Sequence, residues 1–287
     1  MGIRRKREQI DTIYGCFHKE AKPRLDLTFD YEAAEIRAFF RIAESISPTL
    51  MLDIGANIGV YSIYLSQVKS ISRIFAFEPA PAAFHLLEQN VKLQHRHRII
   101  CRDVALSEKE GVSRFAIFGD LAGNNAIEET RISGKAEAAD SVEVATARID
   151  DEVEATGVTF VCKIDVEGHE LNVLSGGSEF LAGNTGVLQI EHFGDVEELD
   201  AVLERQGYSR IFRMKHDYYY TNIAESETRA TIVDILFDEV ARALVDLKDE
   251  RRLRRRALRA TRRAFDALRF GTDPVIGEKA LKSRKKR

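Results

Sequence analysis

Charged side chains end two apolar runs in this sequence, where they could act on a bound molecule. Lys163, Asp165 and Glu167 alternate with apolar residues, so on an extended backbone all three would share one side. Glu191 and His192 close the second apolar run. Burying charges of both signs is costly unless they pair or bind something. His192 or one of the carboxylates could accept a proton from a hydroxyl, and we favour His192, because an imidazole titrates closest to neutral pH.

The same residues leave a second chemistry open. A cluster of Asp165, Glu167, His169 and Glu191 could hold a divalent cation that polarises a substrate oxygen, with Asp165, His169 and Glu191 as the metal ligands. His169 could instead accept the proton itself. Nothing in the spacing decides between a side-chain base and a metal ion.

A glycine-containing turn points to a nucleoside ligand. Residues 52–66, LDIGANIGVYSIYLS, indicate an apolar strand that breaks at glycine and becomes a helix. Gly55 permits the tight turn, and Gly59 lets the helix pack closely on the sheet. A dinucleotide-binding loop has glycine at the central position, where its backbone touches a pyrophosphate, but this sequence has Asn57. The turn therefore favours a nucleoside without phosphates and disfavours a nicotinamide dinucleotide.

Three acids follow three successive predicted strands. Asp53 ends the first strand, Glu78 the second and Asp103 the third. Glu78 comes 19 residues after Gly59, where a carboxylate can accept hydrogen bonds from both hydroxyls of a ribose. Asp103 could accept from the exocyclic amine of adenine. Acids around an adenosine favour a ligand with positive charge, and S-adenosylmethionine, with its sulfonium and ammonium groups, fits that description.

Short apolar runs alternate with helical patterns, which indicates a mainly parallel sheet covered on both faces. We therefore expect an α/β fold, a doubly wound Rossmann-like sheet, preceded by a helix with Asp30 as its N-cap. The runs GVSRFAIFG and SVEVATA predict an inserted strand pair around residues 120–140, a loop long enough to be a lid. The predicted strands are residues 49–54, 73–77, 98–105, 160–166, 187–192, 209–215 and 231–237, and the predicted helices are residues 60–68, 81–93, 170–181 and 196–206.

Five stretches that carry these residues occur in order between residues 49 and 192: LDIGANIGVYSIYLS, IFAFEPAPAAFHLLEQNVKL, VALSEKEG, ARIDDEV and VCKIDVEGHELNVLSGG. Together they resemble the FkbM-type S-adenosylmethionine-dependent methyltransferases. The resemblance implies a class I methyltransferase fold with seven strands, the last antiparallel, and methyl transfer usually to a hydroxyl oxygen. On the family's cofactor motif fall Asp53, Gly55, Asn57, Gly59 and Glu78, whereas Asp103 stands where the family pattern has Asn.

The composition is that of a globular protein in a reducing compartment. With 287 residues and 44% hydrophobic content, the chain can bury a large core. Cys16, Cys101 and Cys162 show neither metal-ligand nor disulfide-framework spacing. No apolar stretch approaches the length of a membrane span, and the basic start MGIRRKREQI lacks the apolar run of a secretory signal. We expect a cytoplasmic protein.

The C-terminal segment differs from the rest of the chain. Residues 241–287 contain 17 Lys and Arg against 6 Asp and Glu, although the net charge of the whole chain is −3. We predict a basic N-terminal extension of residues 1–29, a methyltransferase domain of residues 30–240 and a basic amphipathic helical arm of residues 241–287. The arm could lie on its own domain, an anionic membrane surface, nucleic-acid phosphates or another chain. Its last nine residues hold six basic and no aromatic side chains, which argues against sequence-specific nucleic-acid binding.

The function expected from these features is O-methylation of a hydroxyl on a sugar, a glycolipid or polysaccharide, or a secondary metabolite. The lid loop and the tyrosines at 218–220, expected in a loop before the last strand, could contact this acceptor, or the tyrosines could belong to a hairpin that covers a sheet edge. The alternative is a methyltransferase-like binding or scaffold protein without catalysis, docked to membrane or nucleic acid by its basic arm.

Overall fold

The computed structural model describes residues 9–12, 15–21, 32–94, 98–118, 125–130 and 140–246. The chain divides into two compact units, Met1–Ala224 and Glu225–Arg287, and each is described by itself. The predicted segment boundaries after residues 29 and 240 stay predictions. Most of the basic arm, with its predicted membrane or chain contacts, lies outside the described residues. No helix within the described ranges combines the length and apolarity needed to span a bilayer.

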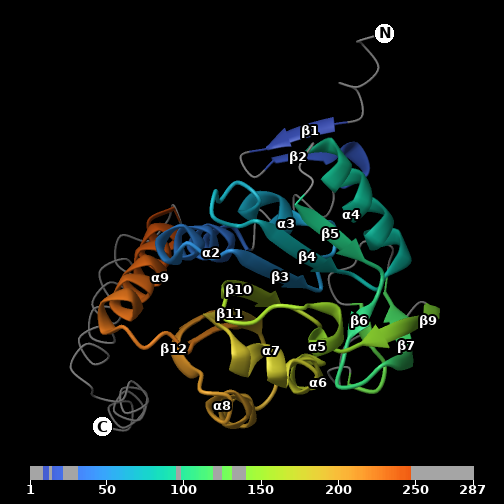
Figure 1. The fold of residues 1–287 in the computed structure, drawn as a ribbon. Coiled ribbons are helices and arrows are strands. Elements are labelled where there is room, and N and C mark those ends of the chain that lie inside the picture. Colours follow the sequence, from blue (N-terminus) through green and yellow to red (C-terminus); the bar gives the residue numbers. More distant parts are fainter. Residues whose placement is uncertain are drawn as a thin grey trace, which may run out of the picture. The chain divides into compact units, whose positions relative to one another are not determined.

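A seven-stranded sheet forms the centre of the first unit, in the order β12-β13-β11-β10-β3-β4-β5 (Figure 1). Strands β5, β4, β3, β10 and β11 are parallel, whereas β13 runs antiparallel to both β11 and β12. This mixed α/β, Rossmann-like architecture confirms the fold class expected from the alternating pattern. The strands are β3 (Leu50–Ile54), β4 (Arg73–Phe77), β5 (Ile99–Arg102), β10 (Thr159–Ile164), β11 (Thr185–Glu191), β12 (Ser209–Met214) and β13 (Asp217–Thr221).

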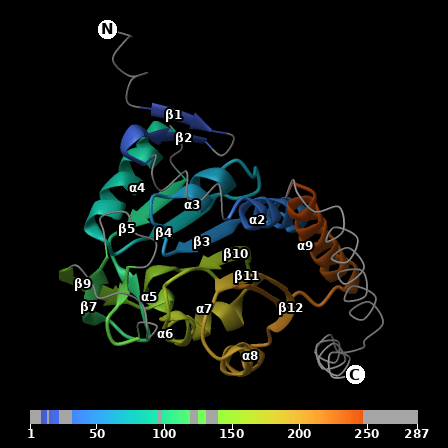
Figure 2. The same cartoon turned by 180° about the vertical axis from the view of Figure 1, so that it is seen from behind.

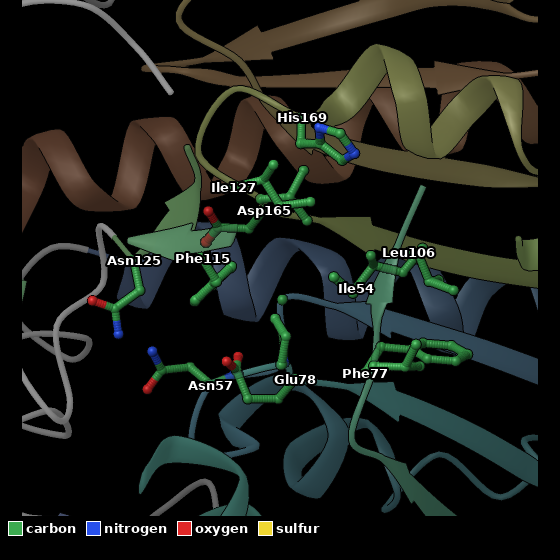
Figure 3. Close-up of a pocket in the computed structure, with 15 residues that line it drawn as sticks. Ile54, Asn57, Phe77, Glu78, Leu106, Phe115, Asn125, Ile127, Asp165 and His169 are labelled. Atoms are coloured by element: carbon green, nitrogen blue, oxygen red, sulfur yellow. The ribbon is translucent and has the colours of Figure 1, made fainter. Parts of the chain in front are cut away.

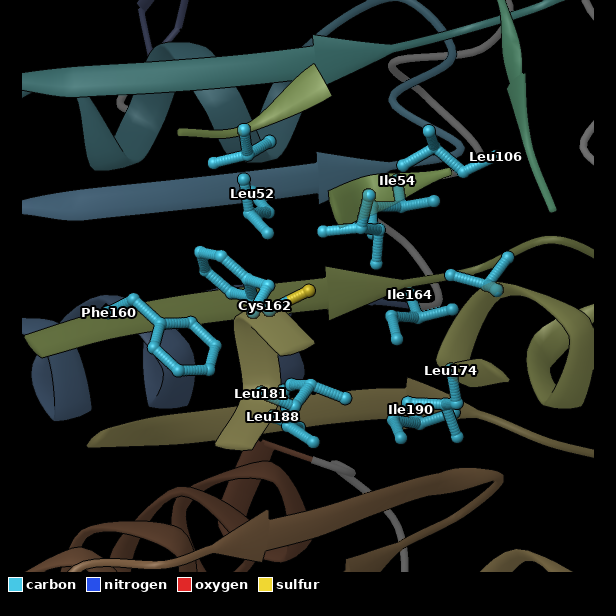
Figure 4. Packing of buried hydrophobic residues seen from close by; sticks show 14 of the residues in the cluster. Leu52, Ile54, Leu106, Phe160, Cys162, Ile164, Leu174, Leu181, Leu188 and Ile190 are labelled. Carbon is cyan, nitrogen blue, oxygen red and sulfur yellow. The ribbon is translucent and has the colours of Figure 1, made fainter. Parts of the chain in front are cut away.

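One face of this sheet forms the apolar core (Figure 4). Alternate residues of the central strands point to this face, and helices α6 (Glu170–Ser175), α7 (Ser178–Gly183) and α8 (Val196–Glu204) cover it. Full burial of each Leu, Ile or Phe side chain contributes roughly 1.5–3 kcal/mol. The central strands contribute Leu52, Ile54, Phe160, Cys162, Ile164, Leu188 and Ile190, and the helices contribute Leu174, Leu181 and Leu199.

The opposite face carries a row of buried polar side chains. The register places Asp53, Lys163, Gln189 and Tyr219 side by side on β3, β10, β11 and β13. Helices α2 (Ala33–Ile46), α3 (Val60–Leu65) and α4 (Pro81–Leu93) lie on this side of the sheet (Figures 1 and 2). Polar groups buried in this way need hydrogen-bond partners, and the partners of this row belong to the candidate site described below.

A smaller sheet, in the order β6-β9-β7-β8, is inserted after β5. Strands β7 (Gly111–Ile117) and β9 (Asp140–Ala147) form the predicted antiparallel pair, and β6 (Ala105–Leu106) and β8 (Ala126–Ile127) are short. The structure describes residues 125–130 and 140 of the predicted lid. The insertion is held by an apolar cluster that joins its strands to the start of α4 and consists of Ala80, Ala83, Ala105, Phe115, Ile127 and Val144.

An N-terminal hairpin of β1 (Gln9–Thr12) and β2 (Gly15–His18), followed by a 3-10 turn at Lys19–Ala21, lies beside helix α4 (Figure 1). The buried Asn90 of α4 connects this hairpin to the glycine-containing turn. Its Oδ1 accepts from the backbone N–H of His18 at 2.7 Å, and its Nδ2 donates to the carbonyl of Ile58 at 2.9 Å.

The predicted last strand is wrong. Residues 231–237 lie within helix α9 (Ser226–Asp246), because a short, mostly apolar run cannot by itself distinguish a strand from a helical segment. The tyrosines at 218–220, predicted in a loop, belong to β13, and Tyr218, Tyr219 and Tyr220 are at most 5% exposed. They form a hairpin with β12, but β13 lies inside the sheet and β12 is the edge. Their buried rings therefore do not flank an acceptor.

Other predicted boundaries shift for local reasons. The helix predicted over residues 170–181 is interrupted between α6 and α7, at Gly176 and Gly177. A Cβ at Gly176 would lie 1.9 Å from the carbonyl oxygen of Ser107, so the chain passes too close to the neighbouring segment for a larger residue. Helix α2 begins at Ala33 with Glu32 at the N-cap, and Asp30, the predicted cap, lies outside the described residues. The strand predicted over 98–105 divides into β5 and β6.

Strands β3 and β10 approach each other closely just beyond their ends. The backbone N–H of Asp165 donates to the carbonyl of Ile54 at 2.9 Å, and Gly55 has a φ of +81°. A Cβ on residue 55 would lie 1.9 Å from the carbonyl oxygen of Asp165. Gly55 therefore serves both the turn and this approach, because any side chain would push β10 away.

The substitution Gly55→Ala is expected to lower the free energy of unfolding by about 3 kcal/mol, because a positive φ is disfavoured for alanine and the backbone must also move. Gly207→Ala is the matched control: its φ is +84°, but nothing lies within 4 Å of a Cβ there, so a loss of only about 1 kcal/mol is expected. Urea denaturation measures both. Equal losses would show that the approach to Asp165 imposes no constraint.

Candidate active site

A cavity opens at the carboxyl ends of the parallel strands, where the strand order reverses between β3 and β10. The space within it, open solvent included, is about 610 Å³. The main sheet and the insertion both contribute to its wall. The lining residues are Ile54, Gly55, Asn57, Phe77, Glu78, Pro79, Val104, Ala105, Leu106, Phe115, Asn125, Ile127, Asp165, Val166 and His169.

Glu78 and Asn57 lie side by side on this wall (Figure 3). One carboxylate oxygen of Glu78 accepts from the backbone N–H of Asn57 at 2.7 Å, and the other accepts from that of Ala80 at 2.8 Å. Asn57 has a φ of +50°, a conformation that asparagine tolerates better than most residues. Each oxygen of an ionised carboxylate can accept a second hydrogen bond. Glu78 can therefore still accept from two hydroxyl groups of a ligand.

Burial raises the pKa of Glu78 to about 7, although the two backbone hydrogen bonds partly oppose this. The carboxyl group thus changes charge near neutral pH. A ligand that donates hydrogen bonds to the ionised form would pull the pKa down again, so that ligand binding and proton release are linked.

Three of the six predicted cofactor residues line the cavity, namely Gly55, Asn57 and Glu78. Asp53 lies behind it, where its carboxylate accepts from the backbone N–H and the hydroxyl of Ser62 at 2.9 and 2.6 Å. This bond holds the first turn of α3 against β3, and burial raises the pKa of Asp53 to about 6. Gly59 has a φ of +87°, and a Cβ there would meet the Leu87 side chain of α4 at 2.5 Å, so its close contact is with a neighbouring helix, whereas the prediction was close packing of a helix on the sheet. Asp103 is exposed and does not line the cavity.

The apolar wall of the cavity is not predicted by the sequence. Leu106, Phe115, Asn125 and Ile127 come from the insertion, whereas Phe77 is the last residue of β4. The only local signal was the alternating pattern of the inserted strands. Their position over the cavity depends on packing against α4, which periodicity does not reveal.

Lys163 stands in a buried network below the cavity. Its Nζ lies 3.1 Å from Asp217 Oδ1, 3.7 Å from Asp165 Oδ2 and 5.5 Å from the centre of the Tyr61 ring. Gln189 donates to the same Asp217 oxygen at 2.7 Å and to the Tyr61 hydroxyl at 3.0 Å. Burial lowers the pKa of Lys163, but the surrounding carboxylates outweigh burial and keep it well above its usual range. Lys163 is therefore a fixed positive charge that positions Asp165.

Glu191 and Asp165 form a coupled carboxyl pair. They end neighbouring strands and share a side-chain hydrogen bond. The negative charge of Asp165, together with burial, raises the pKa of Glu191 well above its usual value. Glu191 therefore keeps its proton at neutral pH, and Asp165 is the member of the pair that lines the cavity.

His192, the favoured proton acceptor, has both ring nitrogens engaged. Nδ1 lies 3.0 Å from a carboxylate oxygen of Glu170, and Nε2 lies 3.3 Å from the backbone carbonyl of Asp195. Burial lowers the pKa of His192, but the hydrogen bond and charge of Glu170 outweigh it, so the pKa is raised. An imidazole that donates from both nitrogens has no lone pair for a substrate proton. Its geometry favours a structural role, with Glu170 as the partner that the sequence analysis did not identify.

His169 lines the cavity and Glu167 does not. The two ring nitrogens of His169 lie 2.8 Å from the Thr130 hydroxyl and 2.9 Å from the Ser107 hydroxyl, and burial lowers its pKa. Glu167 has a φ of +56° and shapes the turn after β10. The candidate metal ligands Asp165, His169 and Glu191 are not gathered: within the described ranges, no three His, Cys, Asp or Glu side chains form a group that could hold a metal ion.

Comparisons with known proteins agree on one family. Residues 53–210 match the family model described as Methyltransferase FkbM domain. The chain is 30% identical over 155 residues to hexuronic acid methyltransferase AglP of Haloferax volcanii, which covers 53% of this chain and 60% of that protein. It is 29% identical over 163 residues to 2-O-methyltransferase NoeI of Sinorhizobium fredii, and the match covers 50% of this chain and 63% of that protein. It is 28% identical over 216 residues to methyltransferase sdnD of Sordaria araneosa, and the match covers 64% of this chain and 83% of that protein.

Glu78 is expected to make the stability of the protein fall as the pH rises. Its pKa is about 7 in the folded chain against an ordinary 4.5, so the folded state binds more protons between these values. The contribution of protonated Glu78 is complete below about pH 4.5 and is lost as the pH rises through 7, by up to about 3 kcal/mol. Urea denaturation from pH 5 to 8 measures this slope.

The variant Glu78→Gln cannot ionise and is expected to reduce that slope between pH 5 and 7, leaving the contributions of Asp53 at the acidic end and of Glu191, whose pKa is raised to about 9, across the whole range. Asp103→Asn, which removes another strand-end acid outside the cavity, is the control and should keep the slope of the natural chain. If Glu78→Gln kept the full slope, the titrating group would lie elsewhere.

Proposed function

The chain belongs to the FkbM methyltransferase domain family, whose model matches more than half of its residues, and we propose that it transfers a methyl group from S-adenosylmethionine to a hydroxyl oxygen. The observation that carries this proposal is the placement of Glu78. Its two oxygens are held by backbone N–H groups on the cavity wall, with acceptor capacity left for the two hydroxyls of a ribose.

The remaining wall suits the other parts of the donor. Phe77, Val104 and Leu106 provide an apolar slot beside Glu78, where a planar base can be enclosed. Gly55 and Asp165 lie where the two central strands meet, and the negative Asp165–Glu191 pair there favours a cationic group. S-adenosylmethionine supplies a methyl group activated by a positively charged sulfur.

The chain's own residues would then align the acceptor hydroxyl with the methyl group and accept the proton that this hydroxyl loses. An in-line displacement turns a charged sulfur into a neutral thioether, so alignment and exclusion of water are the main requirements. We assign acceptance of the hydroxyl proton to Asp165, because it lines the cavity and lies beside Glu191, which keeps its own proton at neutral pH. Lys163 holds its carboxylate in place, and Glu191 shares the proton already present.

The acceptor proposed for this reaction is a hydroxyl on a sugar, a glycolipid or polysaccharide, or a secondary metabolite. The relatives support this choice through their names, since one is a hexuronic acid methyltransferase and another a 2-O-methyltransferase. Both ring nitrogens of His192 are engaged, which favours a carboxylate over this imidazole as the catalytic group. The candidate metal ligands do not form a cluster among the described residues, which favours a carboxylate over a metal ion.

Calorimetric titration with S-adenosylmethionine is expected to show binding to the natural chain. Glu78→Ala should weaken it about tenfold or more, because two hydrogen bonds to the ribose are lost. Asp103→Ala removes an acid outside the cavity and should change the affinity less than twofold. Circular dichroism verifies that both variants are folded. No binding to the folded natural chain would refute the proposed function.

Asp165→Asn is expected to lower the turnover number about 100-fold while the affinity for the donor changes only a few-fold, since a general base contributes roughly 10²–10⁴. Glu167→Gln, in the same turn but outside the cavity, is the matched control and should stay within threefold. Transfer of labelled methyl groups to an acceptor-containing extract measures both. A larger loss for His192→Gln than for Asp165→Asn, at equal stability, would move the base to His192.

A further inference from the structure

The cavity occupies only part of the carboxyl edge of the sheet. Its lining comes from β3, β4, β10 and the segments that follow β5, while no residue after β11 or between β12 and β13 belongs to it. If the donor binds in the cavity, the rest of this edge remains for the acceptor, because parallel sheets bind their ligands beyond the carboxyl ends of their strands.

An aromatic pair stands at that remaining part of the edge. Phe193 follows β11, and its ring centre lies 4.5 Å from that of His216, which is in the turn between β12 and β13. The backbone N–H of His192 donates to the carbonyl of His216 at 3.0 Å, so the two segments are joined. Phe193 is 41% exposed, and among the described residues only Val112 is another exposed large hydrophobic. Part of the Phe193 ring is therefore open at this edge, where the face of a ligand ring can stack on it.

Acidic side chains lie near this pair. Glu191 precedes Phe193 by two residues, Asp217 follows His216 and is the register partner of Glu191, and Asp165 is hydrogen-bonded to Glu191. Lys163 is the buried cation among these acids. The segment that holds His216 also carries two exposed cations, Arg213 and Lys215, and Lys215 Nζ lies 2.8 Å from Glu35 Oε1. The buried part of this edge therefore holds three acids and one cation, and the charge of Asp165 is the largest cause of the raised pKa of Glu191.

We propose that Phe193 and His216 form the binding surface for the acceptor, and that the acceptor is an uncharged ring bearing several hydroxyl groups, as in a neutral sugar. The C–H face of the ring would stack on the aromatic pair, and its hydroxyls would donate to Glu191 and Asp165. This inference rests on the proposed function, because it places the acceptor beside the donor.

The charge of the edge determines which sugars fit. Hydroxyl groups donate to carboxylates at little desolvation cost, whereas a sugar carboxylate would face like charges within a few ångströms. Such repulsion at a partly buried site amounts to tenfold or more in binding. The inference therefore separates this chain from its hexuronic acid-methylating relative in acceptor charge.

The first test compares sugar pairs that differ at C6, where the neutral member has a hydroxymethyl group and the acidic member a carboxylate: methyl glucoside with methyl glucuronide, and methyl galactoside with methyl galacturonide. Labelled methyl transfer from S-adenosylmethionine is measured for each. The neutral member of an accepted pair is expected to have at least a tenfold higher kcat/KM. A preference for the acidic member, or transfer to none of the four while calorimetry shows donor binding, would overturn the inference.

The second test uses Phe193→Ala, with Phe193→Tyr as the conservative variant and Val112→Ala as the matched loss of an exposed hydrophobic. Phe193→Ala should raise the KM for the neutral sugar about tenfold, with kcat and donor affinity within twofold, because only stacking is removed. The other two variants should stay within threefold in KM. An unchanged KM in Phe193→Ala, in a variant that still binds S-adenosylmethionine, would contradict the acceptor surface alone. A natural chain that binds no S-adenosylmethionine would contradict the proposed function itself.

Discussion

The close approach of β3 and β10 at Gly55 is the constraint on which the site depends. It brings the carbonyl of Asp165 into the space that a side chain at residue 55 would occupy. The turn after β3 and the turn after β10 therefore meet at one point. Through this contact, the turn that holds Asn57 beside Glu78 is packed directly against the turn that carries Asp165.

The two faces of the sheet serve different purposes. The apolar face stabilises the fold through ordinary burial of Leu, Ile and Phe side chains. The opposite face holds Asp53, Lys163, Gln189 and Tyr219 in a row, an arrangement that is costly unless its members satisfy one another. Lys163 neutralises part of the acidic charge, and Gln189 ties Asp217 to Tyr61 of α3. A protein built for stability alone would place apolar residues there.

The sequence predicted those parts of the molecule that depend on local order. The strand at Arg73–Phe77 and the helix at Pro81–Leu93 have the predicted bounds, and the Gly-x-Asn-x-Gly turn lies on the cavity as expected. The sequence did not predict contacts between side chains and segments that are distant in the chain. Nothing near His192 in the chain shows that Glu170 and Asp195 occupy both ring nitrogens. Likewise, the tyrosines of β13 are buried because β11 and β12 flank them, a pairing that their own sequence does not encode.

Asn90 shows how a position remote from reacting groups can restrict the sequence. Its amide accepts from the hairpin at one atom and donates to the turn at the other. Among side chains of that length, only an amide provides both; aspartate would set an oxygen against the carbonyl of Ile58, and leucine would leave two backbone groups unsatisfied. Position 90 therefore tolerates few replacements, and its side chain joins the N-terminal hairpin to the glycine-containing turn on the cavity.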